Sequence, residues 1–115
     1  MDGMIDGTQL RVLAEAAGKE AVMPILDAFW QSNDEILRQL ESDLSAGDAD
    51  GAARSAHALK GSASNLGATC VAETAKQIEL AAKAADLAAA RPSASRLQSE
   101  IALTKTAFDQ LMASI

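Results

Sequence analysis

The 115-residue sequence is poor in the residues that cross-link small folds and in those that build β-sheets. It has one cysteine, Cys70, no tyrosine, two phenylalanines, one tryptophan and two prolines. A single cysteine excludes a disulfide framework and a thiolate metal cluster, and it fits a reducing cytoplasm. The scarcity of aromatics, beside many alanines and leucines, favours helices over strands. We therefore expect an all-α, cytoplasmic protein.

The sequence also lacks clustered positive charge and long apolar runs. Lys and Arg number 10 against 16 Asp and Glu, which gives a net charge of −6. Nucleic-acid surfaces need clustered Lys and Arg, so this balance argues against one. No apolar stretch approaches the length that spans a bilayer, and no signal-peptide pattern opens the chain. We expect binding neither to nucleic acid nor to membranes, and contact with partners through a local patch.

Apolar residues recur at helical spacing between short breaks, with no internal repeat, and they predict one domain over residues 1–115. The expected helices cover about 8–17, 19–46, 48–66 and 69–85, and a fifth runs from Asp86 or Pro92 to about Ser114. Four amphipathic helices joined by short turns bury their apolar faces against each other most simply in an antiparallel bundle. The fold class is therefore an antiparallel four-helix bundle with a short additional N-terminal helix.

Particular residues are assigned to helix ends and to the core. Thr8 and Asp48 are N-cap candidates, and Gly47 and Gly67 end the second and third helices. Pro24 is placed in a first helical turn, where backbone N–H groups lack partners, whereas Pro92 predicts a kink or a fresh start. The expected core positions are Val22, Leu26, Phe29, Asn33, Ile36 or Leu37, Leu40, Leu44, Ala52, Leu59, Leu66, Val71, Ala75, Ile78, Ala82, Leu97, Ile101, Leu103, Thr104, Phe108 and Leu111. The acidic residues of the second helix are interpreted as a solvated face: Asp27, Asp34, Glu35, Glu41 and Asp43.

The one histidine, His57, is expected to point into solvent. At about 100° per residue, Leu59 and Leu66 lie roughly opposite it on the third helix. Gly61 and Ser64 follow on nearly the same line, and Ala68 is taken to extend this strip of small residues. A glycine within a helix costs about 1 kcal/mol relative to alanine, and core packing does not explain it on an exposed face. We infer that another backbone must come close to His57.

The residues around His57 suggest phosphoryl chemistry. A neutral imidazole nitrogen is a competent nucleophile toward phosphorus, and Lys60 places a mobile cation beside it, with Arg54 on the other side. No nucleotide-binding loop accompanies them, and a single histidine without a cysteine or carboxylate cluster predicts no metal site. A nucleophile without a phosphate donor site of its own must receive the group from another protein. The residues therefore imply a carrier.

The segment SAHALKGSASNLGA, residues 55–68, resembles the signature of histidine-containing phosphotransfer (Hpt) domains of bacterial multistep phosphorelays. The fixed positions of that signature are met by Ala56, His57, Leu59, Lys60, Gly61, Ser62, Asn65, Leu66, Gly67 and Ala68. Similarity extends from about residue 5 to residue 111 and includes Ile78-Glu79 on the fourth helix. The resemblance covers nearly the whole chain.

The resemblance implies a four-helix bundle that relays phosphoryl groups without autokinase activity. His57 would be phosphorylated at Nε2, Lys60 would lie beside the phosphoryl group, and Gly61 would admit the loops of the partner. The expected partners are a hybrid sensor histidine kinase and response regulator receiver domains, with Mg²⁺ brought by the receiver and no cofactor held by this chain. Arg54, Gly61, Ser64 and Ala68 are the expected partner contacts, and the chain is expected to be a monomer.

Other interpretations stay open. His57 could be a structural histidine, and the chain could be an adaptor that binds receivers without transferring phosphate. It could also be the phosphorylatable domain of a chemotaxis-type kinase. Asn65 and Gly67 are better explained by helix-end chemistry, Ser62 by packing under the next helix, and Trp30 by either a bundle boundary or a partner-facing patch.

Overall fold

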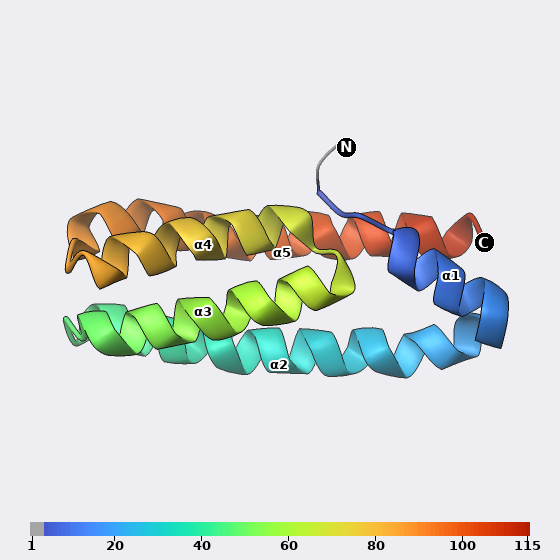
Figure 1. The fold of residues 1–115 in the computed structure, drawn as a ribbon, viewed down its shortest axis with the longest axis horizontal. Helices are drawn as coiled ribbons and strands as arrows, with labels where there is room; N and C mark the ends of the chain where they lie inside the picture. Colours follow the sequence, from blue (N-terminus) through green and yellow to red (C-terminus); the bar gives the residue numbers. More distant parts are fainter. Residues whose placement is uncertain (1–3) are drawn as a thin grey trace.

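A computed structural model describes residues 4–115, and its helices form a long bundle (Figure 1). The helices are α1 (Thr8–Ala17), α2 (Lys19–Ser45), α3 (Ala49–Leu66), α4 (Thr69–Lys83) and α5 (Leu87–Ala113). Helices α2 and α3 lie beside each other, α4 packs on α3 and on α5, and α1 crosses the end of the bundle near the start of α2. Short turns reverse the chain after α2, α3 and α4. The expected antiparallel four-helix bundle with a short N-terminal helix is confirmed.

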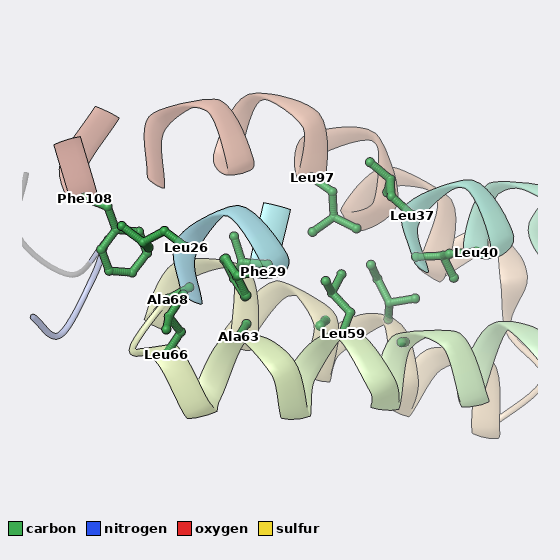
Figure 2. Close-up of a cluster of buried hydrophobic side chains, with 14 of the residues drawn as sticks. Leu26, Phe29, Leu37, Leu40, Leu59, Ala63, Leu66, Ala68, Leu97 and Phe108 are labelled. Carbon is green, nitrogen blue, oxygen red and sulfur yellow. The ribbon is translucent and has the colours of Figure 1, made fainter. Parts of the chain in front are cut away.

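The buried side chains are mostly those that the apolar spacing predicts, and many of them meet in one cluster (Figure 2). Leu40, Leu59, Ile78, Leu97 and Phe108 are the largest apolar side chains fully enclosed by the four long helices. The prediction for Leu103 is wrong, because its side chain is 41 % exposed. Leu103 is next to Thr104, which is buried, and adjacent helical residues point about 100° apart.

Two polar positions on α2 differ in their surroundings. Asn33 is buried as expected, yet its amide nitrogen and oxygen have no partner among residues 4–115. Asp43 contradicts its assignment to the solvated acidic face, because it is buried and accepts hydrogen bonds of 2.9 Å from Gln39 Nε2 and Ser55 Oγ. These donors replace the water that a carboxylate loses on burial. Asp43 therefore ties α2 to α3.

Side chains cap the N-termini of α3 and α5, whereas the N-cap residues of α1, α2 and α4 make no side-chain capping bond. Asp48 accepts the N–H of Gly51 at 2.9 Å as the N-cap of α3, and Asp86 accepts the N–H of Ala89 at 3.1 Å at the start of α5. Thr8 is the first residue of α1 and does not cap it. Its N–H and hydroxyl both donate to Asp6 Oδ1, at 3.1 and 2.6 Å, so a carboxylate two residues earlier takes the capping role.

Both prolines lie inside helices, which contradicts the first-turn placement of Pro24. Pro24 is the sixth residue of α2 and therefore lies beyond the first turn, and Pro92 holds the same position in α5. Neither can donate to the carbonyl four residues earlier, so each helix forgoes one backbone hydrogen bond. Helix α5 nevertheless begins at Leu87 and continues through Pro92, so the earlier of its two expected starts is right.

Trp30 lies at the boundary of the core. Its ring is half-buried and makes edge contacts with Phe29 and Phe108, with ring centroids 4.9 and 6.1 Å apart. Such aromatic pairs add to the stabilisation from burial alone. These contacts favour the boundary interpretation of Trp30.

Among residues 4–115, no helix is both apolar enough and long enough to cross a membrane.

Candidate functional site

His57 lies on the exposed face of α3, as predicted. Its side chain is 67 % exposed, while Ala56 and Leu59 on the same helix are fully buried. The apolar face of α3 packs against α2 and α4, and this packing fixes the direction in which His57 points. A structural histidine enclosed by the core is therefore excluded.

Glu79 of α4 lies beneath the histidine and holds its inner nitrogen. Glu79 Oε2 is 2.8 Å from His57 Nδ1, and Oε1 accepts a bond of 2.7 Å from Lys60 Nζ. Lys83, one turn later on α4, places its Nζ 3.2 Å from Oε2. The side chain of Glu79 is only 4 % exposed, so these three groups replace its hydration.

The charge of Glu79 decides which imidazole nitrogen carries the proton. The Lys60 ammonium is the main cause that lowers the pKa of Glu79 from an ordinary 4.5 to about 2, and bonds from His57 and Lys83 add to it against the opposing effect of burial. At neutral pH the group is a carboxylate, which only accepts hydrogen bonds. His57 Nδ1 must therefore carry hydrogen, and the lone pair of the neutral ring is on Nε2. The exposed ring has a nitrogen free to attack.

The small residues near His57 are partly where the helical geometry places them. Gly61 and Ser64 are exposed, and a Cβ added to Gly61 would meet nothing within 4 Å. Ala68 contradicts the prediction, because it is fully buried and belongs to the core cluster (Figure 2). Gly67 is left-handed with φ 85°, and it redirects the chain so that the line of exposed positions ends with the helix.

Arg54 lies one turn before His57 and is exposed. It lines two shallow grooves along α3, of about 440 and 310 Å³. The first is formed by Ala53, Arg54, His57, Ala58, Glu79 and Lys83. The second is formed by Glu35, Ile36, Gln39, Arg54, Ser55 and Ala58. Arg54 is thus exposed beside His57, and its role as a partner contact stays a prediction.

The remaining signature residues have structural surroundings. Leu59 and Leu66 are core residues, Ser62 is half-buried and Asn65 is exposed. Gly67 ends α3 and carries a second constraint, because a Cβ there would collide with the backbone oxygen of Asp6. The N–H of Asp6 in turn donates to the Gly67 carbonyl at 2.6 Å. The glycine therefore serves both the helix end and the passage of the N-terminal segment.

Glu79 and Lys83 were missing from the residues assigned to the site by sequence. Glu79 belongs to the Ile78-Glu79 pair that the resemblance singles out, yet it was given no role. The signal was available, because position 79 falls one turn after Ala75 on the buried face of α4, between Ile78 and Ala82. An acidic residue on a buried face needs a cationic or hydrogen-bonding partner.

Among residues 4–115, no three His, Cys, Asp or Glu side chains are grouped so that they could hold a metal ion.

Comparisons with known proteins agree with this geometry. Residues 24–107 match the family model described as the Hpt domain. A crystal structure of histidine-containing phosphotransfer protein B (HptB) from Pseudomonas aeruginosa is similar over 100 % of this chain and 99 % of that one, with a TM-score of 0.85 and 31 % sequence identity. The comparison with curated proteins gave no match. The family match and the full-length structural similarity show that this chain belongs to the Hpt-domain family of phosphorelay histidine phosphotransfer proteins.

Proposed function

We propose that His57 accepts a phosphoryl group on Nε2 from the aspartyl phosphate of a receiver domain and passes it to a second receiver. The observation that carries this proposal is the 2.8 Å contact between His57 Nδ1 and the buried carboxylate of Glu79. It orients an exposed ring and leaves the solvent-facing nitrogen as the nucleophile. A solvated surface histidine without a function has no need of such a partner.

The transfer step uses one lone pair and releases one carboxylate. The Nε2 lone pair forms the N–P bond while the bond between phosphorus and the aspartate oxygen breaks, and its electrons return to the receiver's carboxylate. The imidazole keeps its Nδ1 hydrogen and becomes positively charged. Glu79 accepts a hydrogen bond from that Nδ1–H and stabilises the new positive charge, as an orienting carboxylate does beside a catalytic histidine. The reverse step returns the phosphoryl group to a receiver.

Lys60 supplies a cation beside the incoming phosphoryl group. Its side chain is 32 % exposed, and its ammonium is held 2.7 Å from Glu79 Oε1. A phosphoryl group on Nε2 adds negative charge one helical turn away, within reach of this flexible side chain. We assign Lys60 to charge stabilisation and Gly61 to the close approach of the receiver.

The partners and conditions follow from this assignment. The donor is the receiver domain of a hybrid sensor histidine kinase, and the acceptor is a response regulator receiver. The receiver supplies Mg²⁺, and this chain supplies the nucleophile and its position. We further propose that the chain works in the cytoplasm as a monomer and has no autokinase activity.

The proposal is tested with a receiver domain carrying radioactive phosphate on its aspartate. Incubation with this chain is expected to transfer the label, and the product should be labile in acid and stable in alkali, as a phosphohistidine is. His57→Gln should receive no label while keeping the circular dichroism and melting temperature of the wild type. Incubation with labelled ATP alone should leave the wild type unlabelled.

Three results would contradict the proposal. Label that persists in His57→Gln would place the phosphoryl group on another residue. Binding to the receiver without any transfer would favour the adaptor interpretation. Labelling from ATP in the absence of a kinase would overturn the assignment as a carrier.

A further inference from the structure

Three cations gather around His57 on a chain whose net charge is −6, and they differ in their partners. Lys60 and Lys83 both contact Glu79, at 2.7 and 3.2 Å, so their charges are partly neutralised. Arg54 is exposed and has no ion pair or side-chain hydrogen bond among residues 4–115. Its guanidinium is therefore the cation of this surface that remains available to a partner.

The guanidinium of Arg54 lies between two grooves on the surface of the protein. Its side chain lies where the two grooves along α3 meet, one opening beside His57 and the other toward α2. Much of the surface of both grooves is apolar, so a partner seated there would remove water from the guanidinium. A charge that loses water at an interface must be matched by an opposite charge, or binding is weakened. An arginine also forms two parallel bonds to a carboxylate, which a lysine does not.

We propose that Arg54 selects the receiver by pairing with a carboxylate on the receiver's docking surface. This inference rests on the proposed function and deepens it, because it names a residue that discriminates among partners rather than one that reacts. Receivers that present Asp or Glu opposite Arg54 dock productively, whereas those that present Lys or Arg there are rejected. Arg54 touches neither Glu79 nor the reacting nitrogen in this structure, so its effect falls on docking and not on the chemical step.

The test separates docking from chemistry by measuring single-turnover transfer from a phosphorylated receiver domain over a range of receiver concentrations. The receiver used is the one that phosphorylates the wild type fastest in a panel of purified receiver domains. Arg54→Glu is expected to raise the half-saturating concentration about tenfold or more, since it replaces an attraction with a like-charge repulsion. The rate at saturation should change little, and Arg54→Lys should lie between wild type and Arg54→Ala.

Lys105→Glu is the matched control. It makes the same change in net charge at an exposed lysine of α5, in a groove between α2 and α5 and away from α3. Its half-saturating concentration should stay close to that of the wild type, and both variants should keep the wild-type melting temperature. A long-range effect of net charge alone would move Arg54→Glu and Lys105→Glu together.

A charge exchange completes the test. Replacing the acidic residues of the receiver's docking surface by arginine, one at a time, should identify one variant that transfers poorly to the wild type and is rescued by Arg54→Glu. Equal behaviour of Arg54→Glu and Lys105→Glu, or a fall only in the saturating rate, overturns the role of Arg54. A wild type that accepts no phosphoryl group from any receiver overturns the proposed function itself, so the two failures are distinguishable.

Discussion

At the scale of single residues, the chemistry proposed for this protein rests on a buried carboxylate, Glu79, beneath an exposed imidazole, His57. His57 is 67 % exposed and Glu79 is 4 % exposed, so one partner meets solvent while the other is enclosed by protein. A hydrogen bond to a charged group contributes about 1.5–3 kcal/mol, and more is lost when a charge is left without its partners. The pair therefore orders a side chain that would otherwise rotate freely at the surface.

Removing the carboxylate should slow transfer without removing the nucleophile. Glu79→Ala removes the oxygen that accepts the hydrogen bond from His57 Nδ1. Loss of a hydrogen bond to a charged group predicts roughly a tenfold to hundredfold lower rate of phosphoryl transfer at saturating receiver. Nitrogen NMR of the imidazole provides a second readout, because the wild type should hold hydrogen on Nδ1 whereas the variant should mix both tautomers. An unchanged tautomer in Glu79→Ala would show that Glu79 does not orient the ring.

Two substitutions of Gly61 separate its effect on stability from its effect on docking. The position is helical and exposed, and a Cβ there meets no atom within 4 Å, so Gly61→Ala should raise the free energy of unfolding by about 1 kcal/mol. Gly61→Gln fills the space beside His57 and should raise the half-saturating receiver concentration. Urea denaturation measures the first effect and single-turnover transfer the second. A half-saturating receiver concentration that stays the same or falls in Gly61→Gln would contradict the inference that the receiver approaches closely at Gly61.

At the scale of helices, the C-terminal end of α3 is held by hydrogen bonds to the N-terminal segment, in addition to the bonds within the helix. The N-terminal segment crosses the α3–α4 turn, where the N–H of Asp6 donates to Gly67 and the N–H of Cys70 donates to the Met4 carbonyl at 3.2 Å. Met4 is buried, which adds an apolar contact to these bonds. The segment therefore closes the end of the helix that carries His57.

Gly67→Ala should be strongly destabilising. Its φ of 85° costs an L-residue about 1–2 kcal/mol, and the new methyl group would also displace the Asp6 backbone. We expect a loss of stability above 1 kcal/mol in urea denaturation. Gly47→Ala is the comparison, because its φ is 70° but its Cβ would meet nothing within 4 Å. Equal losses in the two variants would mean that the Asp6 contact adds nothing.

At the scale of the whole molecule, the buried carboxylate couples stability to pH. The pKa of Glu79 falls from an ordinary 4.5 to about 2 on folding, chiefly because of Lys60. The unfolded chain then binds a proton before the folded one does, so this stabilisation is complete above pH 4.5 and is lost as the pH falls toward 2.

Thermal denaturation between about pH 6 and about pH 2 should therefore show a smaller decline in melting temperature for Glu79→Gln than for the wild type, since the neutral amide has no proton to gain. Asp6, whose pKa is also lowered by its bonds from Thr8, is retained in both proteins, so the variant should still lose some stability in acid. Parallel curves for the two proteins would contradict the charge assigned to Glu79.

The sequence was sufficient to predict the helical bundle and the exposure of His57, because both follow from the helical period. Leu59 and Leu66 lie opposite the histidine on any regular helix, and short turns leave four amphipathic helices few other ways to pack. Capping also acts over a few residues, which is why Asp48 and Gly67 were assigned correctly. Pro24 was misplaced, because it lies beyond the first turn of α2, where the packing of a long helix compensates for one missing hydrogen bond.

Only the tertiary structure brought Glu79 to His57, because the two are 22 residues apart and lie on different helices. The burial of Ala68 and Asp43 was decided in the same way, by the turn that Gly67 makes and by the donors that α3 presents to α2. Local patterns specify which face of a helix is apolar, but they do not specify which side chains meet across a helix interface. The sequence therefore specified His57 as the proposed nucleophile, and the packing of α3 against α4 placed the carboxylate that contacts it.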